Sequence, residues 1–223
     1  MSLKQLLVSS DKKFVYHFIP RSAVSSLKYN LQEYIDGMGV VPKDKVEVHN
    51  SPLHRNAAAV AREVAELGNF PEHFKFVVVR NPYDRVLSFY YEYVLTGTSH
   101  FGKHVNTFEL FIETLKNVDR LNLWGPEHDH IMPTINMLAP LDTYDKIYKL
   151  EEDAFARITK DLGLDEFEKV RFSDADRLDT YHDLDPKQAD DLFEVIETIY
   201  SGDLDTFKYT REESNYLKRM RYV

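Results

Sequence analysis

A six-residue run from Phe74 to Val79 (FKFVVV) constrains the fold more than any other part of this sequence. Five of its six residues are aromatic or β-branched. This pattern is typical of a strand that is buried on both faces of a parallel sheet, because neither face meets water. Arg80, Asn81 and Pro82 interrupt the run, and the apolar spacing over residues 83–94 is helical. The run therefore predicts a central strand that leads almost directly into a helix.

The rest of the chain alternates between the same two patterns. Further strands are predicted over residues 13–19, 45–49 and 144–150. Further helices are predicted over residues 22–31, 56–67, 108–116, 152–162 and 186–200. Such alternation indicates an α/β fold with a mainly parallel central sheet flanked by helices. The eight glycines and nine prolines are scattered, with no repeat and no linker, so one domain over residues 1–223 is expected.

Composition excludes several classes of function. Cysteine is absent, which excludes a disulfide framework, a cysteine nucleophile and thiolate metal sites. The net charge of −9 argues against a general nucleic-acid binder, although it allows a local basic pocket. No apolar stretch approaches the ~20 residues that span a bilayer, and the first residues lack the apolar centre of a signal peptide. A cytoplasmic protein without a nucleic-acid or membrane partner is expected.

The segment IPRSAVSSL, residues 19–27, joins the first predicted strand to a helix. Ligands of parallel sheets bind beyond the carboxyl ends of the strands, and a helix N-terminus attracts anions through its N–H groups and its dipole. Arg21 adds a charged fork, and Ser22, Ser25 and Ser26 add hydroxyl donors. A P-loop-like phosphate-binding strand–loop–helix is predicted, although the Walker A pattern is missing. The alternative is an ordinary capped helix.

A second candidate phosphate site follows the central strand. Arg80 ends that strand, and Ser88 lies eight residues later on the next helix. Pro82 at the first helical position lets the helix begin at once, so Arg80 and Ser88 can converge on one phosphate. Arg85 is a third candidate ligand. The alternative is an ion pair between Arg80 and Asp84.

Together these segments resemble the sulfotransferases that use 3′-phosphoadenosine 5′-phosphosulfate (PAPS), in their carbohydrate, or family 2, branch. Residues 74–90 (FKFVVVRNPYDRVLSFY) resemble the family's F-x-F-V-R-[ND]-P-[YFW]-[ED]-R-x-x-S-x-Y segment, and residues 19–27 resemble its IPK-T-x-G-T-S-L-like loop. Residues 130–134 (HIMPT) resemble its H-x-x-P-[QT] element. Residues 144–163 and 199–209 resemble its Y-D-x-I and closing Y-x-x-D segments, so the resemblance covers residues 13–209.

The resemblance implies the sulfotransferase fold and the transfer of a sulfuryl group from PAPS to a hydroxyl of a carbohydrate or glycan-like acceptor. It implies that Arg21 takes the place of the lysine that holds the 5′-phosphosulfate and helps the phosphate leave. Ser25 and Ser26 would donate to the same group from the helix start. Arg80 and Ser88 would bind the 3′-phosphate.

The first loop departs from the family pattern at two positions. Arg21 replaces a lysine, and Val24 replaces a frequent glycine. A β-branched residue rarely adopts a positive φ, so none is expected at Val24.

Sulfuryl transfer also needs a base that takes the proton of the acceptor hydroxyl. His49 is the first candidate, because it ends a predicted strand at the carboxyl edge of the sheet. The family also often places a catalytic histidine between the two phosphate segments. His54 is the second candidate, and Glu47 is a weaker carboxylate option.

His130, in the H-x-x-P element, is a candidate for lining the acceptor site, and its alternative role is to organise the loop. His128, Asp129 and His130 lack the further ligands of a metal site, and the family needs none, so no metal is expected.

Two other functions stay open. One is a nucleotide-dependent phosphotransferase, against which the missing Walker A residues count. The other is a non-catalytic sulfotransferase-like nucleotide-binding protein, which the altered first loop favours. The sequence predicts neither the identity of the acceptor nor the oligomeric state.

Overall fold

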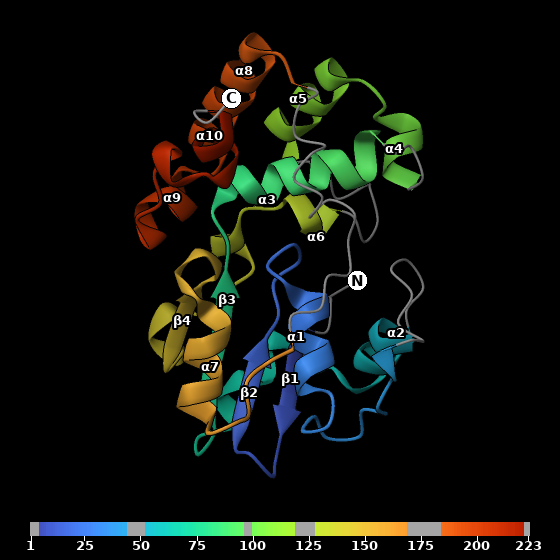
Figure 1. Cartoon of the computed structure of the whole chain (residues 1–223), viewed down its shortest axis with the longest axis vertical. Helices are drawn as coiled ribbons and strands as arrows, with labels where there is room; N and C mark the ends of the chain where they lie inside the picture. The colour runs from blue at the N-terminus through green and yellow to red at the C-terminus, as the bar shows by residue number, and fades with distance from the viewer. Residues whose placement is uncertain (1–4, 44–51, 96–99, 119–127, 169–183, 221–223) are drawn as a thin grey trace. The chain divides into compact units, whose positions relative to one another are not determined.

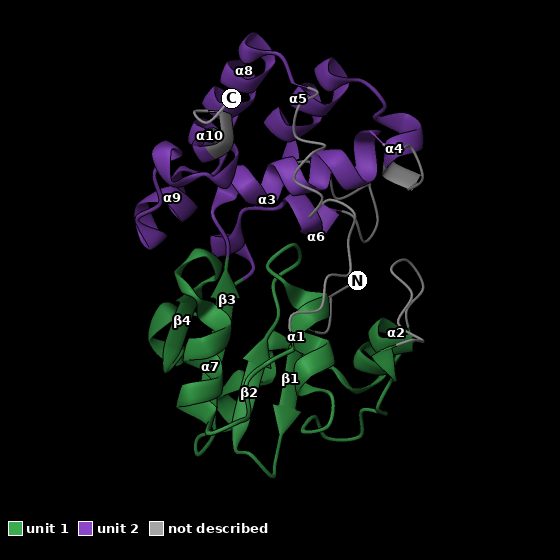
Figure 2. Ribbon diagram, viewed as in Figure 1, with its two compact units in different colours: residues 1–79, 138–172 green, residues 80–137, 173–223 purple. Residues whose placement is uncertain are grey.

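The computed structural model describes residues 5–43, 52–95, 100–118, 128–168 and 184–220 (Figure 1). The chain divides into two compact units, each made of two separate stretches (Figure 2). Unit 1 comprises residues 1–79 and 138–172, and unit 2 comprises residues 80–137 and 173–223. The chain first passes from unit 1 to unit 2 at the end of the FKFVVV run. The single domain expected over residues 1–223 stays a prediction.

Unit 1 is built on a four-stranded sheet. The strands are β1 (Leu6–Ser9), β2 (Phe14–His17), β3 (Phe74–Val79) and β4 (Lys146–Lys149), in the order β1-β2-β3-β4. β1 pairs with β2 in antiparallel fashion, whereas β2, β3 and β4 run parallel. The α/β class with a mainly parallel sheet is therefore confirmed. The prediction lacks β1, because its four residues are all buried and so show no alternation of polar and apolar positions.

Three helices of unit 1 pack against one face of this sheet, namely α1 (Val24–Leu31), α2 (Pro52–Val60) and α7 (Ala154–Leu162) (Figure 1). Tyr16, Phe76 and Tyr148 point to this face from β2, β3 and β4. Successive residues of a strand point to opposite faces, so Val77 and Val79 lie on the other side, and they are fully buried too. β3 is thus buried on both faces, as its sequence predicts.

The helix predicted over residues 56–67 is wrong beyond Val60. Arg62 leaves the helix and forms a bridge with Leu6, whose N–H donates to the Arg62 carbonyl (2.9 Å) and whose carbonyl accepts from the Arg62 N–H (2.8 Å). A 3₁₀ helix, η2 (Val64–Asn69), follows. The alanine-rich pattern favours a helix throughout, but the backbone of Arg62 forms hydrogen bonds with β1 instead of continuing the helix. The predicted strand over 45–49 lies outside the described residues.

Unit 2 is helical. α3 (Pro82–Phe89) begins at Asn81, whose side chain accepts from the Tyr83 N–H (3.1 Å), and has Pro82 in its first turn. A π-helical turn, η3 (Tyr90–Leu95), continues it, so the helix predicted over 83–94 is present with a change of winding at Tyr90. The other α-helices of the described part are α4 (His100–His104), α5 (Phe108–Lys116), α6 (His128–Ile131), α8 (Pro186–Ile199), α9 (Ser201–Phe207) and α10 (Asn215–Met220).

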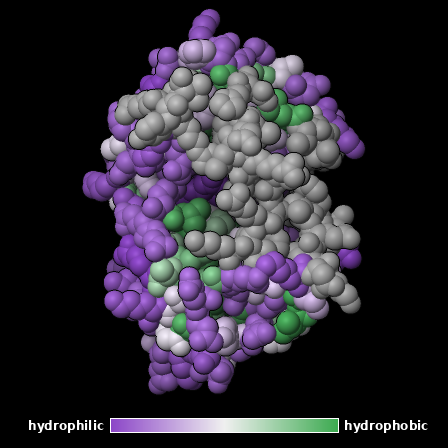
Figure 3. All heavy atoms as spheres, in the orientation of Figure 1, coloured by the Kyte–Doolittle hydropathy of each residue, from purple (hydrophilic) through white to green (hydrophobic). Residues whose placement is uncertain are grey.

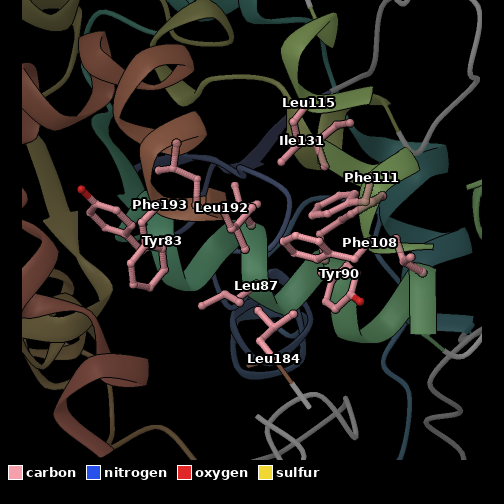
Figure 4. Packing of buried hydrophobic residues seen from close by; sticks show 14 of the residues in the cluster. Tyr83, Leu87, Tyr90, Phe108, Phe111, Leu115, Ile131, Leu184, Leu192 and Phe193 are labelled. Carbon is pink, nitrogen blue, oxygen red and sulfur yellow. The ribbon is translucent and has the colours of Figure 1, made fainter. Parts of the chain in front are cut away.

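The core of unit 2 forms around α3 (Figure 4). All eight residues of α3 are buried. Tyr83 meets Phe193 of α8 edge to face at 4.9 Å between ring centroids, and Tyr90 lies 5.1 Å from Phe111 of α5. α3 is therefore the central helix against which α5 and α8 pack.

Two sequence elements far apart in the chain form one structural piece of unit 2. The Tyr200 hydroxyl donates to the carbonyl of Ile131. The carboxylate of Asp203 accepts from the N–H groups of Thr134 (2.7 Å) and Ile135 (2.8 Å). The Y-x-x-D segment near the C-terminus thus fixes the backbone of the H-x-x-P element.

Hydrophilic side chains predominate on the coloured part of the face shown in Figure 3. Large apolar side chains exposed in the described residues come singly from different segments: Val40, Leu95, Leu110 and Leu141. Isolated residues of this kind need no binding partner to explain them. Over the described ranges, no helix combines the length and the apolar character that crossing a bilayer requires.

Asp84 ties α3 to the start of α10. Its carboxylate is 2% exposed and accepts from the Ser214 hydroxyl (2.8 Å) and from the backbone and side-chain N–H groups of Asn215 (3.0 and 2.9 Å). A negative charge at the N-terminus of a helix is also favoured by the helix dipole. The acid of the Arg-Asn-Pro segment therefore holds the C-terminal helix in place.

We expect Asp84→Ala to lower the free energy of unfolding by about 3 kcal/mol, because it leaves buried donors without their charged acceptor. Urea denaturation followed by circular dichroism measures the loss. Asp191→Ala, at an exposed position of α8, is the matched control and should cost under about 0.5 kcal/mol. Equal losses in the two variants would contradict the role given to Asp84.

Candidate active site

The loop between β2 and α1 has an unusual backbone. Arg21 has φ 67° and Ala23 has φ 58°, so two residues with side chains adopt the left-handed region. Each such residue costs about 1–2 kcal/mol. Val24 is not among them, as its β-branched side chain predicts, and α1 begins at this residue. The strain falls on the two residues that surround Ser22.

Ser22 is the most buried residue of this loop. Its N–H donates to the Ile19 carbonyl (3.2 Å), which closes a tight turn. Its side chain is 0% exposed, and its hydroxyl has no hydrogen-bond partner within the described structure. Leaving a buried hydroxyl unpaired costs about 1–3 kcal/mol. Strain and an unpaired donor at one helix start are typical of a site built for a ligand.

The N-terminus of α1 supplies the remaining groups. Ala23 is its N-cap residue and offers no side-chain acceptor to the first N–H groups of the helix. Ser25 and Ser26 lie in the first turn, directly after Val24. A helix start of this kind binds anions. The loop thus has the P-loop-like strand–loop–helix arrangement that the sequence predicts.

The structure brings one of the two candidate bases to this loop. Nε2 of His54, on α2, lies 3.1 Å from Oγ of Ser25. Burial, with a smaller contribution from the positive charge of Lys28, lowers the pKa of His54 to about 4. The imidazole is therefore neutral at pH 7 and can accept a proton. His49 and Glu47 lie outside the described residues.

Lys28 is a residue of this site that the sequence prediction misses. It lies on α1, one turn after Ser25, and is only 5% exposed. Its Nζ lies 4.0 Å from the centroid of the Phe18 ring, and burial lowers the pKa of the ammonium to about 8. The only signal in the sequence is that Lys28 shares a helix face with apolar Leu31, and most lysines in such places extend to solvent.

His17 is a second residue that the prediction misses. It ends β2, and its ring lies within 2.6 Å (Nδ1) of the Tyr144 hydroxyl and 3.1 Å (Nε2) of the Gln5 side-chain oxygen. The Tyr144 oxygen also accepts from the Ala139 N–H (3.0 Å). One arrangement satisfies every group: Tyr144 donates to Nδ1, and Nε2–H donates to Gln5. Burial lowers the pKa of His17 to about 3, so this network holds a neutral ring just before the strained loop.

The second predicted phosphate site belongs to unit 2. Arg80 is partly exposed and immediately precedes Asn81, the N-cap residue of α3. Ser88 lies in the last turn of α3 and is 1% exposed. The expected start of the helix at Pro82 is confirmed. The phosphate contacts of Arg80 and Ser88 stay predictions.

A model of the sulfotransferase family matches residues 4–210. The chain belongs to the sulfotransferase family. The match is to its family 2 branch and runs from the residues before β1 to the end of the Y-x-x-D segment. No curated protein and no solved structure matches the chain. The protein is thus a transferase of sulfuryl groups, which it takes from a sulfonated donor, and this assignment disfavours the phosphotransferase alternative.

Arg85 of this sulfotransferase is not available to a phosphate. The prediction that it is a third phosphate ligand is therefore wrong. Its side chain is 0% exposed. Nη1 donates to the Met132 carbonyl (2.7 Å) and Nη2 to the Asp129 carbonyl (3.1 Å). The arginine therefore holds the backbone of the H-x-x-P element. Asp84, its neighbour, caps α10 as described above, so both charged residues of the motif's Asp-Arg pair serve the fold of unit 2.

His130 of the sulfotransferase packs among aromatic rings. It meets Tyr93 at 5.3 Å and Phe89 at 6.3 Å between ring centroids, edge to face in both cases. This packing supports the alternative that His130 organises the loop, and its contact with an acceptor stays a prediction. Nε2 of its neighbour His128 is bonded to the Val118 carbonyl (2.8 Å). Across the described residues, no group of three or more acidic or histidine side chains is arranged to hold a metal ion.

We expect His17 to make the sulfotransferase unstable in acid. Its pKa is about 3 in the folded protein and about 6.5 in the unfolded chain, so between these values the unfolded state binds the extra proton. Stability is then lost as the pH falls below about 6.5, at about 1.4 kcal/mol per pH unit. His17→Asn should remove this part of the slope. The measurement is the free energy of unfolding from urea titrations at pH 7.0, 6.0 and 5.0.

Tyr144→Phe is the matched control, because it removes a partner of the ring but keeps the titrating group. It should lower stability at every pH and retain the slope. The role given to His17 fails if His17→Asn keeps the full wild-type slope.

Proposed function

We propose that the protein transfers the sulfuryl group of PAPS to a hydroxyl of a carbohydrate or glycan-like acceptor. One observation of the structure supports this proposal in addition to the family assignment. The β2–α1 loop holds Arg21 and Ala23 in strained conformations around the buried, unpaired hydroxyl of Ser22. This loop stands where the family binds the phosphosulfate of its donor. An anion at this loop would satisfy the hydroxyl and the helix N-terminus together.

We assign the donor's two anionic ends to the two segments. Arg21, Ser22, Ser25 and Ser26 would hold the 5′-phosphosulfate, with the guanidinium and the helix start supplying positive charge. Arg80 and Ser88 would hold the 3′-phosphate, as the matched Arg-Asn-Pro segment implies. The chain's acid excess is compatible with this, because the cations of the loops act locally.

The reaction requires three actions from the protein. It must align the acceptor oxygen with sulfur, stabilise the departing phosphate, and remove the acceptor's proton. A bond forms between the acceptor oxygen and sulfur while the bond from sulfur to the bridging phosphate oxygen breaks. Arg21 and the N–H groups of α1 stabilise the charge that gathers on that phosphate. The phosphate leaves as part of adenosine 3′,5′-bisphosphate.

His54 is the base that the described residues support. Its ring is neutral at pH 7, because burial and Lys28 disfavour the imidazolium. Ser25 lies 3.1 Å from Nε2 and therefore links the base to the loop that holds the donor. When the Ser25 hydroxyl donates to the phosphosulfate instead, Nε2 becomes free to take a proton. His49 remains the alternative base.

We expect the protein to bind adenosine 3′,5′-bisphosphate in isothermal titration calorimetry. Arg21→Met and Arg80→Met should each weaken binding about 10- to 100-fold, since each removes a charged contact worth roughly 1.5–3 kcal/mol. Arg157→Met is the control, because Arg157 is an exposed residue of α7 that pairs with Glu152 (2.9 Å). No binding by the wild-type protein would refute the proposed donor.

We expect His54→Gln to slow sulfuryl transfer about 10²- to 10⁴-fold while changing bisphosphate affinity less than about threefold. Release of the bisphosphate from PAPS, with a panel of monosaccharide and disaccharide acceptors, measures the rate. His49→Gln is made in parallel. If only the His49 variant loses activity, the base is His49 and the assignment of His54 is wrong.

A further inference from the structure

The hydroxyl of Ser25 has a single proton, and two acceptors compete for it. Oγ of Ser25 lies 3.1 Å from Nε2 of His54, within hydrogen-bond distance. Both side chains are partly buried, one on α1 and the other on α2. The proposed function assigns the same hydroxyl to the phosphosulfate of the donor. A hydroxyl has one proton to donate, so it serves either the ring or the donor.

The ring of His54 offers one acceptor nitrogen. A neutral imidazole carries one N–H group and one nitrogen lone pair. Burial lowers the pKa of His54 to about 4, so the ring is neutral at pH 7. Nε2 is the nitrogen that contacts the first turn of α1, and a base at this position needs its lone pair there. Ser25 then donates to that lone pair and blocks it.

We propose that Ser25 is a positioning residue that couples donor binding to release of the base, so that the donor must bind before the acceptor hydroxyl can be activated. This rests on the proposed function, in which His54 is the base and Ser25 contacts the phosphosulfate. An anionic oxygen accepts a hydrogen bond more strongly than a neutral nitrogen does. The donor therefore takes the hydroxyl from His54 and leaves the lone pair of Nε2 unoccupied.

The proton of Ser25 changes its acceptor but stays on the serine oxygen. During transfer, the proton of the acceptor hydroxyl passes to Nε2 of His54 as the bond between oxygen and sulfur forms. The bond from sulfur to the bridging phosphate oxygen breaks in the same step. After the bisphosphate leaves, the imidazolium gives its proton to water, and Ser25 again donates to Nε2. No further reactant is needed.

The exchange of partners has a consequence for affinity. Each donor molecule that binds must break the bond between Ser25 and His54, so this bond weakens donor binding. A ring without an acceptor nitrogen would remove the competition. Glutamine at position 54 would retain it, because its side-chain oxygen can accept from Ser25.

Isothermal titration calorimetry with adenosine 3′,5′-bisphosphate tests this competition. His54→Phe keeps a ring of similar size without an acceptor and should tighten binding about 2- to 10-fold. His54→Leu is the second variant if His54→Phe does not fold. The gain should vanish when Ser25→Ala is also present, because no hydroxyl is then released. A histidine with only a structural role would instead weaken binding when it is replaced.

Ser26→Ala is the matched control for Ser25, because successive side chains of a helix point about 100° apart. His54→Phe should tighten binding by the same factor with and without Ser26→Ala. Ala58→Leu, at an exposed position of α2, should leave the affinity unchanged. Unchanged or weaker binding by both His54 variants would overturn the inference, and so would a gain that persists in Ser25→Ala.

NMR of the ring nitrogens gives a second readout, which needs no activity. The Nε2 signal of His54 is assigned in ¹⁵N-histidine-labelled protein by its loss in His54→Phe. Saturating bisphosphate should move this signal in the wild-type protein toward its position in unliganded Ser25→Ala. Identical Nε2 signals in the unliganded wild-type protein and unliganded Ser25→Ala would overturn the inference. Absence of bisphosphate binding would instead refute the proposed function, and the comparison without ligand would still decide whether Ser25 occupies Nε2.

Discussion

Parallel pairing of β2 with β3 is the interaction on which the rest of the structure depends. It places His17 opposite Val77, so β2 ends two residues before β3 does. β3 can occupy the centre because its residues are apolar on both faces. The chain then leaves β2 through the strained loop to α1 and leaves β3 through Arg80 to α3. Both phosphate segments of the family thus follow directly from strands of one parallel pair.

The energetics of the first loop favour binding over stability. Arg21 and Ala23 are strained, Ser22 is buried with an unpaired hydroxyl, and Lys28 is buried with its Nζ 4.0 Å from the centroid of the Phe18 ring. Each feature destabilises the protein by itself. The strained residues and the unpaired hydroxyl lie at one helix start, where an anion would accept from Ser22 and from the first N–H groups of α1. The neutral network of His17, Tyr144 and Gln5 fixes the strand end from which this loop begins.

The sequence predicts the parts of this structure that depend on local patterns. The FKFVVV run identifies β3, Pro82 identifies the start of α3, and Asp185 identifies the capping box of α8. The IPRSAVSSL segment identifies the strand–loop–helix. In each case the residues that form the sequence pattern also make the contacts that define the strand or helix.

What the sequence does not predict depends on partners far along the chain. Arg62 leaves its helix because of Leu6, and Arg85 is buried because the carbonyls of Asp129 and Met132 accept from it. In the sequence, Lys28 cannot be told from a surface lysine, because its burial depends on the packing of α1. In the same way, the sequence does not show that Tyr144 and Gln5 will be the partners of His17. Charge and hydrogen-bonding capacity can be seen in a sequence, whereas the groups that will satisfy them cannot.

The central claim is that the β2–α1 loop is the anion site of a sulfotransferase. The most direct measurement follows the backbone amide shifts of ¹⁵N-labelled protein as adenosine 3′,5′-bisphosphate is added. The account predicts that the amides of residues 22–26 shift strongly and saturate together, while those at the start of α7 do not. Saturable shifts that leave residues 22–26 unchanged would contradict it.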